Sequence, residues 1–324
     1  EIYTVDTYPY EYAQTQSNLG IAYWVSSEIQ DKKLNLNLAI SAYQKAFEIY
    51  TVENYPYEYA RTKSNIGIAY RKLSNVQDRE TNINLAIDAY QEALQIYTIE
   101  NYPLEYARVQ NSLGLAYWYL SEIQDKESNI NLSMNCYHES LKIYTIEDYP
   151  LNHAQTKSNI GIAYRILSEI RDKEQNLNLA ISTNHESLKI YTIENYPLEY
   201  ARVQNNLGLI YFELSDIRDK EQNLNLAISA YQEALEIYTV ENNLLGYVHV
   251  QNNLGLVYFE LSEIRDKEQN LNLAINAYRE IDEIRNFEIS VYGYSNIHNG
   301  LEVVYSNYTN QMYMPTPQNS ISTI

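Results

Sequence analysis

The chain has 324 residues, and its 42 acidic and 23 basic side chains give a formal net charge of −19. This balance excludes a nucleic-acid-binding protein, which needs a basic surface to displace counterions from phosphates. The single Cys excludes a disulfide framework and indicates a reducing compartment, so we expect a cytoplasmic protein, and no apolar run reaches the roughly 20 residues that span a membrane.

The sequence is a tandem repeat with a period of 47 residues. An Ile opens each of the six full copies: Ile2, Ile49, Ile96, Ile143, Ile190 and Ile237. We number positions within a repeat from this Ile, so that position 19 of the first repeat is residue 20. A fixed period of this length predicts a solenoid, in which each repeat buries its apolar face against its neighbours.

Two helices are predicted in each repeat. In the first repeat a helix begins near Tyr8-Pro9, because Pro suits the first helical position and disfavours helical geometry in the residue before it. Apolar residues recur at helical spacing on both sides of a turn. The second helix is capped by either Asp31 or Asn35. No segment alternates with period two, so no sheet is expected.

The domain organisation follows from this period. Residues 1–7 match the end of a preceding, truncated repeat, and residues 8–288 hold six helix pairs. The pattern decays beyond them, where residues 289–311 are predicted to form a capping helix and residues 312–324 a flexible tail. The chain lacks an initiator Met and opens inside a repeat, so we expect a piece of a larger protein.

Gly fills position 19 of all six repeats: Gly20, Gly67, Gly114, Gly161, Gly208 and Gly255. Gly inside a helix costs about 1 kcal/mol relative to Ala. We therefore expect the backbone of a neighbouring helix to approach closely at this position, where a Cβ would not fit.

Leu19-Gly20-x-x-Tyr23, followed by Ala39-x-x-x-Tyr43, resembles the tetratricopeptide repeat signature, and the same pattern recurs in phase along the chain. The 47-residue unit is longer than the usual 34 residues, and the Trp expected before the Leu is absent. Armadillo and HEAT repeats have the right length but lack the Leu-Gly motif. The chain also looks like long arrays from prokaryotic multidomain proteins and is similar to the repeats of kinesin light chains.

This resemblance implies an all-α, right-handed superhelical solenoid of antiparallel helix pairs, with a concave groove lined by the first helices. Position 17 falls on the expected groove face and is Asn in five repeats: Asn18, Asn65, Asn159, Asn206 and Asn253. In the resembling family, an Asn just before Leu-Gly binds the backbone of an extended peptide. The alternative is that these amides bond only to the adjacent repeat.

Two further positions complete the predicted peptide-binding surface. Position 13 supplies the basic residues Arg61, Arg108 and Arg202, and position 23 supplies Trp24, Arg71, Trp118 and Arg165. Position 23 changes between Trp, Arg and Phe, which is unusual for a shared core, so we interpret it as a contact surface. The alternative is that its aromatic residues belong to the core. Basic side chains in an otherwise acidic chain favour an acidic partner.

The sequence contains no phosphate-binding Gly loop, no metal-ligand spacing and no nucleophile beside a base, so neither an enzyme nor a cofactor is expected. The leading hypothesis is a scaffold that binds a partner protein or an extended peptide in its groove. The competing hypothesis is a structural spacer or self-association module that positions an effector domain elsewhere in the protein.

Overall fold

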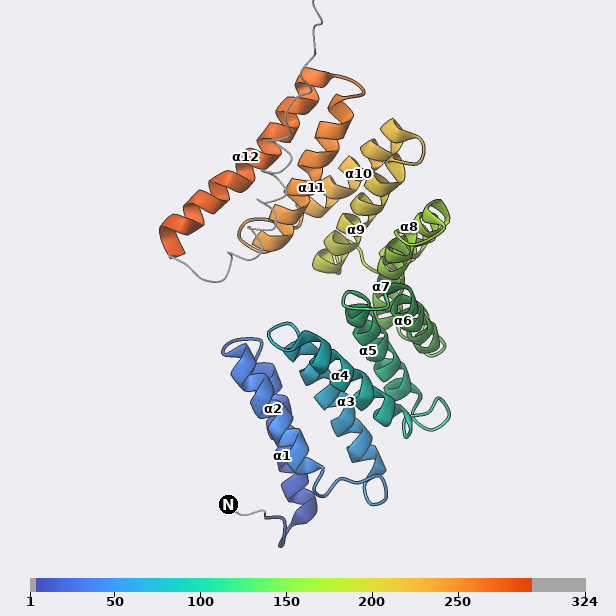
Figure 1. The fold of residues 1–324 in the computed structure, drawn as a ribbon, viewed down its shortest axis with the longest axis vertical. Coiled ribbons are helices and arrows are strands. Elements are labelled where there is room, and N and C mark those ends of the chain that lie inside the picture. The colour runs from blue at the N-terminus through green and yellow to red at the C-terminus, as the bar shows by residue number, and fades with distance from the viewer. Residues whose placement is uncertain (1–3, 293–324) are drawn as a thin grey trace, which may run out of the picture. The chain divides into compact units, whose positions relative to one another are not determined.

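The structure is a computed structural model that describes residues 4–292, with side chains as far as residue 284. These residues form twelve helices and no strand, which confirms the all-α class and the succession of helix pairs (Figure 1). The helices are α1 (Pro9–Ser26), α2 (Lys32–Ala46), α3 (Pro56–Leu73), α4 (Arg79–Leu94), α5 (Pro103–Ser121), α6 (Lys126–Leu141), α7 (Pro150–Ser168), α8 (Lys173–Leu188), α9 (Pro197–Ser215), α10 (Lys220–Leu235), α11 (Leu244–Ser262) and α12 (Lys267–Tyr292).

The chain divides into two compact parts, residues 1–190 and residues 191–324. The first part contains α1 to α8, and the second contains α9 to α12. Within each part, a helix packs on its partner in the same repeat and on the next helix along the chain. Both parts are therefore built by the nearest-neighbour stacking that the period predicts.

The first helix of a pair begins where the sequence predicts. Five of these helices have Pro as their first residue, and the Tyr before each Pro lies outside the helical region, as at Tyr8 with φ −142° and ψ 68°. The sixth, α11, lacks the Pro. There the Asn243 side chain takes over as a cap and accepts a hydrogen bond from the Gly246 amide at 2.9 Å.

The second helix begins directly after an Asp in the left-handed conformation, such as Asp31 with φ 45°. This Asp makes no capping bond through its side chain. The other predicted cap, Asn35, bonds backwards instead, with Nδ2 donating to the Gln30 carbonyl at 2.8 Å. The left-handed Asp and the backward hydrogen bond of the Asn recur in all six described pairs. The two helices of a pair are therefore joined by a fixed turn, without a side-chain cap on the second helix.

The position-19 Gly does mark a close approach, but its main neighbour is a side chain and not a helix backbone. A Cβ on Gly67 would lie 2.7 Å from a ring carbon of Tyr90, which stands at position 42 of the same repeat. Five pairs place a Tyr ring here, and the fourth places Asn184 against Gly161. The expectation of backbone contact is corrected accordingly: the Gly makes room for a ring in its own pair.

The core is shared between pairs. Ile83 and Tyr90 of α4 pack with Val109 and Leu113 of α5, all of them buried. In the last pair, α12 continues without a break past residue 288, where the six predicted pairs were expected to end. The rest of the predicted capping helix and the predicted tail lie outside the described residues.

Candidate peptide-binding surface

The first helices lie on the inner side of each part. Neighbouring first helices contact one another, α1 with α3, α3 with α5 and α5 with α7, and likewise α9 with α11. No comparable contact joins neighbouring second helices within the described chain. A stack whose first helices are closer than its second helices bends towards the first helices. A groove in either part is therefore lined by first helices.

The position-17 amides have no partner inside the described chain. Asn18 is exposed and the four others are half-buried, yet none of the five forms a hydrogen bond with a described residue. The Nδ2 atom of Asn206 is buried without a hydrogen-bond acceptor among these residues. A buried polar group that lacks a partner costs about 1–3 kcal/mol, so the Asn206 Nδ2 atom can donate to a ligand at little desolvation cost.

The position-13 Arg residues also lack a bonding partner among the described residues. Arg61, Arg108 and Arg202 take part in no hydrogen bond or ion pair with the described residues, and the Arg61 Nε atom is buried without a partner among them. Arg61 and Arg108 lie near Tyr57, whose pKa is raised by burial and by the Glu105 carboxylate and lowered by the two guanidinium groups. Each Arg precedes position 17 by one helical turn, so the two positions share a face.

The two Lys side chains of α3 are neutralised. Lys63 at position 15 pairs with Glu92 at 2.8 Å, and the Tyr59 hydroxyl donates to the same carboxylate at 2.5 Å. Lys72 pairs with Glu28 at 2.7 Å. The local basic character of the second repeat therefore comes from its Arg residues and not from its Lys residues.

Position 23 differs from the exposed contact surface that the sequence suggests. Trp24 is half-buried against the core cluster that contains Ile66 and Ala69, and its Nε1 atom has no acceptor among the described residues. Trp118 is half-buried in the same way, against Ala163 and Ile166 of α7. Both indoles thus pack at the junction between two pairs and keep part of their surface exposed.

In the first two junctions the residue at position 23 meets position 24 of the next repeat. Lys72 lies 5.8 Å from the Trp24 ring. Arg71 lies 5.9 Å from the Tyr119 ring. At the first junction position 23 carries the aromatic ring and position 24 carries the cation. At the next junction the two are exchanged, so the residues at these positions change together.

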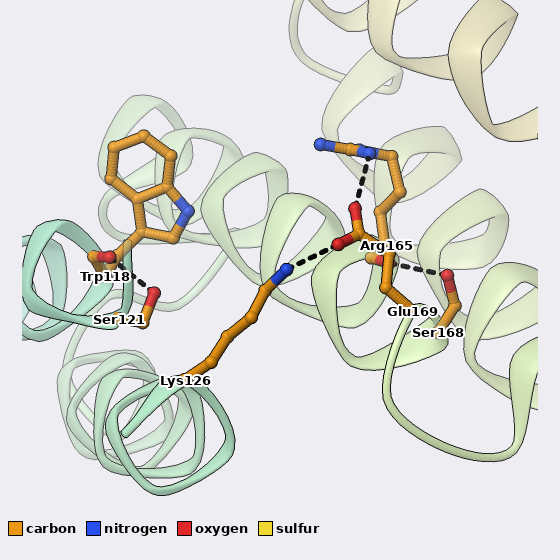
Figure 2. A network of polar contacts seen from close by, with 6 residues as sticks. All are labelled: Trp118, Ser121, Lys126, Arg165, Ser168 and Glu169. Atoms are coloured by element: carbon orange, nitrogen blue, oxygen red, sulfur yellow. Dashed lines mark hydrogen bonds and ion pairs between the residues drawn. The ribbon is translucent and has the colours of Figure 1, made fainter. Parts of the chain in front are cut away.

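Arg165 is held in an ion-pair network (Figure 2). Its guanidinium lies 3.4 Å from Glu169, which also pairs with Lys126 of the preceding helix pair at 2.5 Å. The Ser168 hydroxyl donates to the Arg165 carbonyl, and Ser121 makes the same bond to Trp118. Arg165 is therefore part of the junction between two pairs, and it is less available to a ligand than the position-13 Arg residues.

One polar arrangement was not recognised from the sequence. The position-11 Tyr donates its hydroxyl to the position-44 Glu within a pair, as Tyr106 does to Glu139 at 2.7 Å and Tyr200 to Glu233 at 2.6 Å. The signal was present, because Tyr at position 11 and Glu at position 44 recur together. These bonds fix the first helix against the second and thereby orient the inner face.

Within residues 4–284, no group of three or more His, Cys, Asp or Glu side chains is arranged to hold a metal ion. None of the helices in the described chain combines the length and the apolar character that crossing a membrane requires.

A sequence-family model described as a tetratricopeptide repeat matches residues 208–239. No curated protein sequence matches the chain. Among solved structures, BtubC (BKLC) from P. vanneervenii is similar with a TM-score of 0.53 and 16% identity, over 89% of this chain and 97% of that one. This likeness concerns the fold.

Two more solved structures match at lower TM-scores. MamA protein has a TM-score of 0.43 and 15% identity, over 71% of this chain and 97% of that one. The TPR2AB domain of yeast Sti1, in complex with pHSP90, has a TM-score of 0.30 and 14% identity, over 92% and 98% of the two chains.

Proposed function

Since the chain is a tetratricopeptide repeat array, we propose that it binds an extended, acidic segment of a partner protein along the inner face of its first helices. Such a fold serves in general as a protein-interaction scaffold, because a curved stack of helices offers a long surface to one ligand. One observation carries the proposal: the position-17 Asn and position-13 Arg side chains share a face and have no bonding partner in the described chain.

The two residue types supply complementary chemistry. An Asn amide offers both a donor and an acceptor, which is what the backbone of an extended peptide needs on either side of a residue. An Arg guanidinium binds a carboxylate through two parallel hydrogen bonds. In the first part of the chain Asn65 follows Arg61 by one turn, and in the second part Asn206 follows Arg202. Each such pair can hold one peptide unit and one acidic side chain.

Apolar contact is available beside these polar groups. Position 20 lies three residues after the Asn and holds the half-buried Ile68, Leu115 and Ile162. Their partly exposed side chains form an apolar row between the amides. A partner segment that alternates acidic and apolar side chains would use both.

The spacer hypothesis is less well supported. If the position-17 amides served only to join repeats, they would be bonded to neighbouring helices. Asn111 at position 16 does serve this purpose, since its Nδ2 donates to Thr156 of the next first helix at 2.6 Å. The five Asn side chains at position 17 make no such bond within the described residues, so their amides are free for a different task.

The test is a selection from a random peptide library on the immobilised chain, followed by fluorescence polarisation with the recovered peptides. We expect the selected peptides to be rich in Asp and Glu. Replacement of Asn65, Asn159 and Asn206 by Ala should weaken their binding at least about tenfold, because each lost hydrogen bond contributes roughly 1 kcal/mol.

A matched control replaces Asn54 and Asn101 by Ala, because these exposed amides lie in turns away from the inner face. The control should bind like the unmodified chain. Equal affinity of the unmodified chain and the Asn65, Asn159 and Asn206 variant would rule out the amide mechanism. Selection of peptides without acidic residues would rule out the role of the Arg residues.

A further inference from the structure

The row of Asn side chains at position 17 is interrupted once. In the third repeat this position is Ser112, on α5. Ser112 is half-buried, and its side chain forms no hydrogen bond with a described residue. Since Ser is smaller than Asn, it leaves room on the inner face that an Asn would fill. A side chain of a ligand can enter at this point.

An Arg without a counter-ion in the described chain lies on the neighbouring first helix, α3. Arg71 is half-buried, and its Nε atom is buried without a partner among the described residues. Its guanidinium carbon lies 5.9 Å from the centre of the Tyr119 ring of α5. Arg165 occupies the same position two repeats later and pairs with Glu169 at position 27. Position 27 of the second repeat is Asn75, so Arg71 has no such carboxylate.

A buried hydroxyl lies beside these two side chains. Tyr90 of α4 is fully buried, its ring covers Gly67, and its hydroxyl has no hydrogen-bond partner among the described residues. Burial raises the pKa of this phenol, and the adjacent Arg71 guanidinium and Ser112 hydroxyl lower it. Three polar groups from three successive helices therefore come together without bonding to one another.

This combination occurs at one place in the described chain. Arg stands at position 23 in the second and fourth repeats, but the fourth pair has Asn184 where the second has Tyr90. The next repeat has Ser at position 17 after the second repeat and Asn206 after the fourth. A packing feature of the array would recur with the period, so this cluster indicates a ligand site and not a repeated contact.

One guanidinium and two hydroxyl groups fit a carboxylate. Arg binds a carboxylate through two parallel hydrogen bonds, and a Ser hydroxyl can donate a third. A phosphoryl group carries about −1.5 to −2 charges at pH 7, which a single guanidinium does not balance. Asn65 and Asn159 continue the position-17 row on both sides of Ser112. A segment that follows this row runs past Ser112, so a side chain and not the end of the segment supplies the carboxylate.

We propose that Arg71, Ser112 and Tyr90 form a subsite for the carboxylate of one Asp or Glu side chain in the bound segment. Arg71 and Ser112 contact the carboxylate. Tyr90 is a positioning residue: its hydroxyl accepts a hydrogen bond from the Arg71 Nε–H and donates one to Ser112, whose own hydroxyl then donates to the ligand. The subsite rests on the proposed function, because the segment on the inner face supplies the side chain.

The test uses N-acetyl-aspartate N-methylamide as its probe, since this compound carries the side-chain carboxylate of Asp and no backbone charge. Its carboxyl group is ionised at pH 7. The complete chain is labelled with ¹⁵N, and the Nε signals of its Arg side chains are followed by NMR as the probe is added. The Arg71 signal, identified by its absence from the Arg71→Gln spectrum, should shift and approach a limit. The uncharged N-acetyl-asparagine N-methylamide should leave it in place.

Two substitutions test the hydroxyl groups. Tyr90→Phe keeps the ring that covers Gly67 and removes only the hydroxyl, and Ser112→Ala removes the other one. Each should raise the half-saturating probe concentration about three- to tenfold, which is the effect of losing one hydrogen bond. Tyr90→Phe should not lower the melting temperature, because the hydroxyl has no partner in the described chain. Weaker binding by a variant of unchanged stability cannot come from a loss of fold.

Arg165 is the matched control within the same spectrum. It occupies the same position as Arg71, but its guanidinium is paired with Glu169, so its signal should stay in place. The inference is overturned if the Arg71 signal does not move, or if its shift grows in proportion to the probe without a limit. It is also overturned if the uncharged analogue gives the same shift, or if neither hydroxyl variant changes the half-saturating concentration.

Peptides selected from the library separate this inference from the proposed function. Arg71→Gln should weaken their binding, and amidation of their C-termini should not, because a side chain supplies the carboxylate. Unchanged affinity for Arg71→Gln, together with a loss in the variant of Asn65, Asn159 and Asn206, would remove the subsite and leave the proposed function standing. A saturating Arg71 signal with no loss in that Asn variant would do the reverse. Lost binding on amidation would overturn the assignment to a side chain.

Discussion

The side-chain amide of Asn184 lies against Gly161, at the place where Tyr43 covers Gly20 in the first pair. Asn184 is fully buried. Its Nδ2 donates to the Ala180 carbonyl at 2.8 Å, but its Oδ1 has no donor among the described residues. In the fourth pair Gly161 therefore leaves room for a ring, but Asn184 stands where the other pairs have a Tyr.

The first prediction is that Asn184→Tyr stabilises the protein. The change removes a buried acceptor without a partner, which costs about 1–3 kcal/mol, and adds apolar burial. The melting temperature should rise by roughly 2–4 °C for each kcal/mol gained in a part of this size. Differential scanning calorimetry measures the shift.

Tyr137→Asn in the third pair is the reciprocal control and should lower the melting temperature. An unchanged or lower value for Asn184→Tyr would mean that the surroundings no longer accept a ring.

The second prediction concerns the reason why Gly recurs at position 19 of all six repeats. An ordinary Gly→Ala change inside a helix stabilises by about 1 kcal/mol. Gly67→Ala should instead destabilise by about 1–3 kcal/mol, because the new Cβ would lie 2.7 Å from the buried ring of Tyr90. Urea unfolding measures the difference.

The control for Gly67→Ala is the same change in a Tyr90→Ala background. Without the ring the added methyl group has room, so there the Gly67→Ala change should be neutral or stabilising. An equal penalty in both backgrounds would show that the helix backbone, and not the ring, excludes a Cβ.

The helix pairs were predictable because their signals repeat in phase: a Pro opens the first helix, and apolar spacing defines both helices. The neighbour of the Gly was not predictable in this way. A Gly that recurs inside a helix indicates a close neighbour at position 19. It does not indicate whether that neighbour is a backbone or a side chain. Tyr90 stands 23 residues after Gly67, and only the packing of the pair brings them together.

The neighbours of position 23 were not predictable for a related reason. A position that alternates between Trp and Arg has the variability of a surface. Its partner lies 48 residues later, at position 24 of the next repeat, where Trp24 meets Lys72 and Arg71 meets Tyr119. Complementary change at two positions so far apart is visible only when the repeats are stacked. The proposed role of positions 13 and 17 did not need this information, because it rests on helical spacing alone.

The third prediction concerns the left-handed Asp before each second helix. A left-handed backbone costs an ordinary L-residue about 1–2 kcal/mol, and Gly adopts it freely. Asp125 has φ 45° and makes no capping bond through its side chain. Asp125→Gly should therefore be neutral or slightly stabilising, and Asp125→Val should destabilise by more than about 1 kcal/mol.

Chemical unfolding of the two Asp125 variants gives the comparison. Lys126 next to it begins α6 and supports the ion pair with Glu169, so the measurement is repeated at high salt to separate the backbone effect from the charge effect. If Gly and Val prove equally stable at this position, the left-handed conformation is not a constraint of the turn.

The last prediction is a pH dependence at Glu139. Its carboxylate accepts a hydrogen bond from Tyr106 at 2.7 Å and pairs with Lys142 at 2.6 Å, and these two groups, Lys142 first, hold its pKa below the usual range. A lowered pKa in the folded state means that the stabilisation is complete above the unfolded carboxyl pKa of about 4.3. It is lost as the pH falls through the lower, folded value.

Glu139→Gln should consequently destabilise the protein at neutral pH by no more than about 1 kcal/mol, because the carboxylate is partly exposed and screened by solvent. The difference from the unmodified chain should shrink as the pH is lowered below about 4 and should vanish once both states of the unmodified carboxyl are protonated. Thermal unfolding at a series of pH values measures it. Glu147→Gln is the control and should leave the curve unchanged, because Glu147 is exposed and forms no ion pair with the described residues. A Glu139→Gln penalty that stays constant with pH would mean that the bond from Tyr106 does not depend on the charge.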